Sequence, residues 1–461
     1  MISGTNRRYS NLKTTEMLLP KSICTFNGFW ENFALELSNL GVHWRQNFRA
    51  IFVMPVRTVI SIWPLFAGLS LIGLAVGVQG SLLGVRAAIE GFDDLLIGLL
   101  MSCYFAGFLA GSLLTPKLIQ RVGHIRIFAA LSAVASVTIL VHALFINPWV
   151  WAFMRLVTGF AFSTIYVVSE SWLNQSSNNA NRGQILSLYT TILLAGICVG
   201  QFMLNVADPS GFTLFILISV MVSVAAVPIL LSVVQTPPIE ETERVTIAHL
   251  WYRTRVGVMA IILSQWVSSI LFSMGAVYAT KLGFSVYQVA NFMGSMMAGG
   301  MILQWPLGKL SDTIDRRWVI GFSSFTAVFI AIVISFMNNA SGWLYGLVFL
   351  FGGCSLSLYS IVVAFTNDHL RPAEIVPASG TIILISGLTS ITGPITAVFW
   401  LQLFGLKSFF VLIAVSLFAM GAMSILRVLT IPALPAEYKV QSTLQAAAAP
   451  VGTILHAEEE I

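Results

Sequence analysis

Charged residues are scarce in this chain. They make up 9% of its 461 residues, whereas hydrophobic residues make up 57%. Soluble domains carry roughly 25% charged residues, and a soluble protein this apolar would expose patches that aggregate. A bilayer accepts such a surface. The scarcity of charge therefore excludes an ordinary soluble domain and indicates a membrane protein.

Cysteine is scarce too, and the arrangements typical of enzymes are missing. The four cysteines suggest no disulfide framework, because three lie in long apolar segments and Cys24 lies near the N-terminus. The sequence has no metal-ligand spacing of His and Cys, no phosphate-binding glycine loop and no Gly-x-Ser-x-Gly turn. We therefore expect no catalytic residue, no metal, no cofactor and no enzymatic activity. The net charge of +5 is scattered over short loops, which argues against a nucleic-acid partner.

Apolar runs of about 20 residues, the length that crosses the hydrocarbon core as a helix, recur along the chain. They are too long for strands and lack period-2 alternation. We expect twelve spans, at 58–85, 95–115, 127–146, 149–170, 184–206, 212–234, 256–280, 286–306, 318–337, 343–365, 378–402 and 409–430. The polar break at 235–255 predicts a central cytoplasmic loop. The predicted fold is an all-α membrane protein with two pseudo-symmetric six-helix bundles, 58–234 and 256–430.

The distribution of basic residues predicts the orientation. With a cytoplasmic N-terminus, all but four of the 24 Lys and Arg fall on the cytoplasmic side. Arg86, Lys281 and Lys407 lie in outer loops, and Arg155 lies within a span. This asymmetry follows the positive-inside rule, and both termini are predicted to be cytoplasmic.

The two tails carry less information. We expect no signal peptide, because no short apolar core with a cleavage site precedes the first span. Between Trp30 and Ile51, apolar residues recur at three- and four-residue steps, which predicts an amphipathic helix on the cytoplasmic membrane face within tail 1–57. The alternative is that translation begins near Met54. The C-terminal tail, 431–461, is expected to be disordered.

Two short charged turns with one pattern lie 192 residues apart. The first reads Pro116-Lys-Leu-Ile-Gln-Arg-Val-Gly-His-Ile-Arg126, and the second reads Gly308-Lys-Leu-Ser-Asp-Thr-Ile-Asp-Arg-Arg317. Each lies between two predicted spans, after the second and the eighth. Their equivalent positions indicate that the two halves are copies of one membrane unit.

These turns and the two six-span halves resemble the major facilitator superfamily over about 55–430. The family turn reads Gly-x-Leu-x-Asp-Arg-x-Gly-Arg-Arg. The second copy matches it at Gly308, Leu310, Asp312, Arg316 and Arg317, with Thr313 and Asp315 as departures. The first copy matches at Leu118, Arg121, Gly123 and Arg126, with Pro116 and Gln120 as departures. Segments 151–159, 168–171, 181–183 and 300–308 further resemble a poorly characterised bacterial YcaD-like subgroup, which implies a bacterial inner membrane but no substrate.

The resemblance implies a gating role for the charges of the turns. Acidic and basic side chains there can pair or cap helix ends, and pairing present in one state of a carrier favours that state. The alternative is that these charges only keep the loops inside. The residues predicted to act in gating are Lys117, Arg121, Gly123, Arg182, Gly308, Asp312, Arg316 and Arg317. Arg182 is expected to pair with Glu170 when the inner side closes.

Arg155 is the most costly side chain in the sequence, because it lies about six residues inside the fourth span. At 100° per residue, Tyr166 lies about 20° and Glu170 about 60° around the helix from it, so the three share one face. A rise of about 1.5 Å per residue puts Arg155 and Glu170 about 22 Å apart, too far for direct pairing. The three residues predict a polar stripe along a transport pathway.

In the family, spans 1, 4, 7 and 10 line the central cavity. This adds Gln79, Gln265 and Asp368 to the predicted pathway. The alternative for Glu170 and Asp368 is a solvated helix end, and for Arg155 it is a structural ion pair or a clamp by carbonyl oxygens. A protonatable role for either acid would require burial.

These observations predict a secondary active transporter that moves a small organic solute by alternating access. Without a nucleotide site, an ion gradient, most simply of protons, must drive it as symport or antiport. The expected partners are the solute, protons and membrane lipid, and the expected state is a monomer. The alternatives are a transporter-like sensor or assembly partner without transport, and a lipid transporter.

Overall fold

The computed structural model describes residues 56–177, 182–231, 246–337 and 339–430, and every regular element in these ranges is a helix. Residues from Ile60 onward form one compact unit, which is the subject below. The two expectations for the N-terminal tail and the one for tail 431–461 lie outside the described residues.

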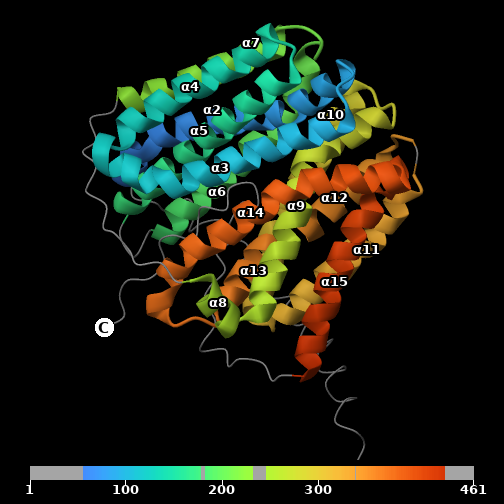
Figure 1. Cartoon of the computed structure of the whole chain (residues 1–461). Coiled ribbons are helices and arrows are strands. Elements are labelled where there is room, and N and C mark those ends of the chain that lie inside the picture. Colours follow the sequence, from blue (N-terminus) through green and yellow to red (C-terminus); the bar gives the residue numbers. More distant parts are fainter. Residues whose placement is uncertain (1–55, 178–181, 232–245, 338, 431–461) are drawn as a thin grey trace, which may run out of the picture. The chain divides into compact units, whose positions relative to one another are not determined.

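The described helices are labelled in chain order in Figure 1. Their bounds are α2 (Val56–Ile89), α3 (Asp94–Val122), α4 (His124–Leu144), α5 (Pro148–Gln175), α6 (Arg182–Met203), η1 (Leu204–Val206), α7 (Thr213–Leu230), α8 (Ile247–Arg253), α9 (Arg255–Lys281), α10 (Val286–Thr313), α11 (Arg316–Ser335), α12 (Gly342–Leu356), α13 (Leu358–Asn367), α14 (Pro372–Phe404), η2 (Leu406–Ser408) and α15 (Phe409–Thr430).

Twelve spans can be traced along these helices. Among the described residues, 11 segments are long and apolar enough to cross a membrane, and α12 with α13 forms one of them, Gly342–Asn367. The remaining long helix, α10, has 28 residues and includes the polar Asn291, Gln304 and Lys309. It packs against α6, α9 and α12 in the position of the eighth span. The predicted all-α, twelve-helix membrane fold is confirmed.

Close helix crossings repeat in the two halves. A Cβ atom on Gly107 of α3 would lie 1.9 Å from the carbonyl oxygen of Leu156 in α5, so only glycine fits there. In the second half, a Cβ atom on Gly299 of α10 would lie 1.8 Å from the carbonyl oxygen of Phe349 in α12. The second and fourth spans of each half therefore cross at backbone distance. This shared crossing supports the internal duplication.

The halves meet through α3 with α14 and through α6 with α10. Cys198 Sγ of α6 donates a hydrogen bond to the carbonyl oxygen of Gly294 in α10 at 3.7 Å. Lys281 at the end of α9 forms an ion pair with Asp94 at the start of α3. These contacts lie toward the helix ends that the charge distribution assigns to the outer side.

Candidate functional site

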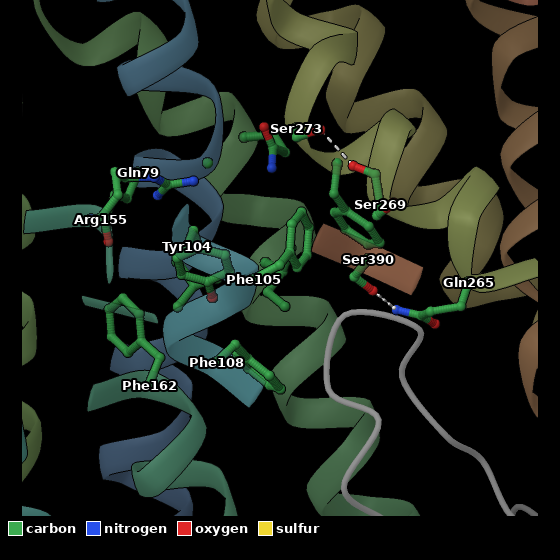
Figure 2. A pocket seen from close by; sticks show the side chains of 15 residues that line it. Gln79, Tyr104, Phe105, Phe108, Arg155, Phe162, Gln265, Ser269, Ser273 and Ser390 are labelled. Carbon is green, nitrogen blue, oxygen red and sulfur yellow. Dashed lines mark hydrogen bonds between the residues drawn. The ribbon is translucent and has the colours of Figure 1, made fainter. Parts of the chain in front are cut away.

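A cavity between the two halves is lined by α2, α3, α5 and α6 of the first half and by α9 and α14 of the second (Figure 2). It comprises about 810 Å³, its opening included. The lining residues are Val76, Gln79, Gly80, Tyr104, Phe105, Phe108, Arg155, Phe162, Ile197, Gln201, Gln265, Ser269, Phe272, Ser273 and Ser390. Of the predicted pathway residues, this lining brings together Arg155, Gln79 and Gln265.

Arg155 is the one charged residue of this lining. The local sequence determines where α5 begins and therefore the depth of Arg155 in the span. Asn147 Oδ1 caps the helix by accepting from the Trp149 N–H at 2.9 Å, and Pro148 is its first residue. Arg155 lies about two turns after this start. Its side chain is 6% exposed. No ion pair among the described residues includes it, so the predicted alternative of a structural ion pair is not observed here.

Uncharged groups hold the Arg155 guanidinium in place. Its Cζ lies 4.4 Å from the ring centroid of Tyr104, a cation–π contact. Its Nη2 lies 3.4 Å from the sulfur of Met101. Nε is buried without a hydrogen-bond partner. A buried cation without a carboxylate is costly, and an anionic ligand would compensate it.

Two amide side chains line the cavity on the same side as Arg155, the side formed by the first half. Gln79 of α2 is 2% exposed, and its Nε2 has no hydrogen-bond partner. Like Arg155, it lines the cavity and is labelled in Figure 2. Gln201 of α6 accepts a hydrogen bond from Ser81, so the residue both lines the cavity and ties α2 to α6.

The opposite wall consists of an amide and hydroxyl groups. Gln265 Nε2 of α9 donates to Ser390 Oγ of α14 at 2.9 Å, a bond drawn in Figure 2. The Ser269 hydroxyl donates to the carbonyl oxygen of Trp266 at 2.8 Å, and that of Ser273 donates to the carbonyl oxygen of Ser269 at 2.6 Å. These bonds leave the serine oxygens with free lone pairs.

Tyr166 and Glu170 are buried and do not line the cavity, although the Tyr166 ring packs against the lining residue Phe108 with ring centroids 6.1 Å apart. Glu170 is 5% exposed and takes part in no ion pair of the described part of the chain. Its carboxyl group interacts with Tyr189 of α6 and with Tyr359 of α13 in the other half. The Tyr166 and Tyr189 hydroxyls have no hydrogen bond of regular geometry. Glu170 is therefore a buried acid and not the solvated helix end considered above.

Asp368 lies in a different environment, paired with the second charged turn. Arg316 Nε donates to Asp368 Oδ2 at 2.8 Å, and its Nη1 donates to Asp312 Oδ1 at 2.7 Å and to Ser311 Oγ at 2.9 Å. The Arg316 and Asp368 side chains are only 1% and 4% exposed. This Arg316 cluster joins α10, α11 and the end of α13. Asp368 is buried in it and lines no part of the cavity.

Arg317 ties the same turn to the last span. It forms an ion pair with Asp315 at 2.6 Å, and its Nη1 donates to the carbonyl oxygen of Arg427 in α15 at 3.1 Å. Asp315 Oδ1 also accepts from the Arg317 N–H and so caps α11. Gly308, at the start of this turn, is buried within α10.

The first copy of the turn lacks such pairing. Lys117 and Arg121 are exposed, and neither belongs to an ion pair of the described residues. Gly123, at φ 88°, separates α3 from α4. His124, at the position equivalent to Arg316, is buried, and its Nε2 lies 3.0 Å from Ser171 Oγ of α5. Arg182 begins α6, and no ion pair joins it to Glu170 in this conformation.

One further ion-pair group lies outside the spans. Glu374 near the start of α14 pairs with His249 at 3.1 Å and with Arg253 at 3.4 Å, both on α8. The N–H of Arg371 donates to Glu374 and lowers its pKa, Arg253 and His249 lower it further, and partial burial opposes them. The pairing connects α8, at the end of the break between the halves, to a helix that lines the cavity.

Sequence reasoning missed part of the cavity. Tyr104, Ser269, Ser273 and Ser390 were not predicted, and α3, α6 and α14 line the cavity beside spans 1, 4 and 7. Serine is common in helix interfaces of membrane proteins, so its sequence pattern carried no distinct signal. The position of Tyr104 against Arg155 follows from the close crossing at Gly107.

The fold and the cavity together define a membrane carrier of two repeated halves. A comparison with known protein families identifies the family: the model of the Major Facilitator Superfamily matches residues 65–394 and 259–457. The chain therefore belongs to this superfamily, as its turns predicted. Its membership supports a secondary transporter, not an enzyme, and makes it an integral multi-pass membrane protein.

Curated relatives support the YcaD-like group. An uncharacterized MFS-type transporter of Enterobacter sp. (strain 638) is 27% identical over 352 residues, 76% of this chain and 91% of the relative. The uncharacterized MFS-type transporter YcaD of Escherichia fergusonii is 26% identical over 367 residues, 79% of this chain and 94% of the relative.

Solved transporters share the fold. A mutant of the nucleoside transporter NupG aligns with a TM-score of 0.68 at 12% identity, over 78% of this chain and 98% of the other. A bacterial homolog of the human lysosomal transporter Spinster, inward-facing and occupied, aligns with a TM-score of 0.68 at 13% identity, over 84% and 99%. The E. coli fucose:proton symporter FucP aligns with a TM-score of 0.53 at 13% identity, over 80% and 99%. At these identities the likeness concerns the fold alone.

Proposed function

We propose that the protein is a secondary active transporter that moves a small organic anion across the membrane by alternating access. The cavity between the halves is the substrate site, and Arg155 binds the acidic group of the solute. Gln79 and Gln265, on opposite walls, contribute amide hydrogen bonds. The protein acts in a bacterial inner membrane as a monomer surrounded by lipid, with both termini cytoplasmic.

The observation that carries this proposal is the unpaired guanidinium in the cavity wall. Arg155 is buried, faces no carboxylate and has an unpartnered Nε. A bound carboxylate, sulfonate or phosphate group would supply the missing charge and accept charge-assisted hydrogen bonds. Tyr104, Phe105 and Phe162 beside it would bind an apolar body.

The distribution of contacts between the halves supports alternating access. The Lys281–Asp94 ion pair and the Cys198–Gly294 hydrogen bond join the halves toward the predicted outer ends. A carrier closed at this end must break these contacts when it opens outward. The Arg316 cluster lies at the opposite end of its helices and stays within the second half, where it supports a gating role together with Gly308 and Arg317.

Glu170 is the residue that we propose for proton coupling. It is buried, its carboxyl group interacts with Tyr189 and with Tyr359 of the other half, and no described residue forms an ion pair with it. A buried charge without an ionic partner is costly. A proton gained from the cytoplasmic side would remove this cost and let the halves rearrange. When the inner side closes, Arg182 is proposed to pair with ionised Glu170. Reversing both charges should restore transport lost in either single variant, and a double variant without recovery would exclude the pair.

The function is tested with purified protein in proteoliposomes. Organic acids that raise the melting temperature are used, radiolabelled, in uptake assays under an imposed pH gradient. We expect saturable uptake that Arg155→Gln abolishes and Arg155→Lys partly retains. Arg255→Gln, the same change at an exposed residue, should transport normally.

Three outcomes would contradict the proposal. The absence of any saturable flux would indicate a sensor or assembly partner. Movement of fluorescent lipid between leaflets, without solute uptake, would indicate a lipid transporter. Uptake unaffected by Arg155→Gln would remove Arg155 from the substrate site.

A further inference from the structure

We infer that the substrate is an organic monoanion with an aromatic or similarly flat apolar body and, at the end opposite its acidic group, a neutral hydrogen-bond donor such as a hydroxyl. The inference rests on the proposed function and extends it to a substrate class. Its basis is that the two walls of the cavity differ in hydrogen-bonding character.

On the wall of the first half, two buried hydrogen-bond donors have no partner. Arg155 Nε and Gln79 Nε2 are both buried and both lack a hydrogen-bond partner. Both residues line the cavity on the side of the first half. Unpaired buried donors are uncommon in native proteins. Two such donors, one of them on a guanidinium, make this wall complementary to an acidic group.

On the wall of the second half, serine hydroxyl groups already donate their hydrogens within the protein, so their oxygens remain as acceptors. The hydroxyls of Ser269, Ser273 and Ser390 donate to backbone carbonyl oxygens in their own helices at 2.8, 2.6 and 2.8 Å. Each oxygen can therefore only accept further hydrogen bonds. Ser390 Oγ already accepts from Gln265, which leaves Ser269 and Ser273 as the acceptors with more free capacity. A ligand group that binds the Ser269 or Ser273 oxygen must donate.

The remaining lining residues determine the apolar body and the net charge of the ligand. Tyr104, Phe105, Phe108 and Phe162 from the first half and Phe272 from the second surround the middle of the cavity. None of the described residues of the lining is acidic, so a cationic donor such as an ammonium group would find no counter-charge among them and would meet Arg155. The donor is therefore neutral, and the net charge of the ligand is minus one.

The test is a matched panel of probes with the purified full-length protein in detergent. 3-(4-Hydroxyphenyl)propionate carries the acid, the ring and the donor. 3-Phenylpropionate lacks the donor, 3-(4-methoxyphenyl)propionate replaces it by an acceptor, and 2-(4-hydroxyphenyl)ethylamine replaces the acid by a cation. Calorimetric titration gives each Kd, and thermal shifts provide a second measurement.

We expect the hydroxy acid to bind about 2- to 10-fold more tightly than 3-phenylpropionate, the range of one hydrogen bond between neutral groups. The methoxy acid should not share this gain, and the amine should bind weakest. The double variant Ser269→Ala with Ser273→Ala should bring the ratio of the two Kd values close to one, because the hydroxy acid loses both acceptors. Arg155→Gln should weaken every acid about 10-fold or more.

The outcomes separate this inference from the proposed function. Acids that bind through Arg155 without preferring the hydroxyl would overturn the inference and leave the anion carrier intact. A preference that survives the double serine variant would overturn the assignment of the acceptor wall. The amine binding best would overturn both proposals. No binding by any probe to folded wild-type protein would overturn this substrate class, while flux assays with other solutes still decide whether the protein is a carrier.

Discussion

The two copies of the charged turn occupy equivalent places and use their charges differently. In the second copy, Arg316 is buried between Asp312 and Asp368 and joins three helices. In the first copy, His124 holds the equivalent position with a hydrogen bond to Ser171, and the cations Lys117 and Arg121 are exposed. One duplicated segment thus became an ion-pair cluster in one half and a neutral contact in the other.

The difference extends to the acids at the ends of the fourth and tenth spans. Asp368 is paired with Arg316, whereas Glu170 takes part in no ion pair of the described residues. Asp368 is thus part of a buried ion pair that suits a structural contact. Glu170 is buried without such a pair, which is why we propose it, and not Asp368, for proton coupling.

The largest effect is expected from breaking the buried cluster. Arg316→Gln should destabilise the protein by about 3–5 kcal/mol, because it removes the cation from a buried ion pair with Asp368. His124→Gln, the matched change in the first copy, should cost about 1 kcal/mol. Thermal unfolding in detergent measures both. Equal losses of stability in the two variants would mean that the ion pairs of Arg316 stabilise the protein no more than the His124–Ser171 hydrogen bond does.

A second comparison concerns transport. Asp312→Asn removes one acid of the cluster, and Gln120→Asn changes the equivalent position of the first copy, where no charge is present. We expect the first change to lower the initial rate of uptake several-fold and the second to leave it nearly unchanged. Uptake rates in proteoliposomes, normalised to inserted protein, test this. Similar rates for the two variants would show that the turn marks common ancestry and has no gating role.

The ion pairs of Glu374 with His249 and Arg253 lie outside both turns and are more exposed than the Arg316–Asp368 pair. They allow the effect of burial on the stability of an ion pair to be compared. Glu374→Gln should cost about 0.2–1 kcal/mol, the range of partly exposed pairs. Since the pKa of Glu374 is lowered in the folded protein, its contribution is present above the unfolded pKa of about 4.3 and is lost as the pH falls below it. Melting temperatures of wild type and Glu374→Gln should therefore converge in acid. A constant difference between pH 7 and pH 3 would contradict this account.

The smallest effect is expected at the exposed cations of the first copy. Lys117→Gln combined with Arg121→Gln should change stability by no more than about 0.5 kcal/mol, because neither residue forms an ion pair. The alternative role of these residues in holding the loop inside is measured separately, from the accessibility of an introduced cysteine beside them to a membrane-impermeant reagent. A large loss of stability would show that this copy does carry structural charge contacts.

Much of the architecture could be predicted from composition and spacing. The apolar runs predicted the spans, and the paired turns predicted the duplication, because span length and turn chemistry are local properties. The cost of a charge within a span likewise identified Arg155 before its surroundings were known. The cavity was predicted only in part: Arg155, Gln79 and Gln265 line it, while Tyr166, Glu170 and Asp368 are buried elsewhere.

The sequence by itself determined that this protein is a duplicated twelve-span membrane carrier with one arginine well inside a predicted span. The hydrophobicity and charge of each span depend on its own residues, so they can be assessed without knowing which helices lie next to it. Only the tertiary structure decided that Arg155 has no acidic partner among the described residues, that Asp368 pairs with Arg316 and that serines of the second half line the same cavity as Arg155. These outcomes depend on which faces of distant helices meet, a property that no single segment carries.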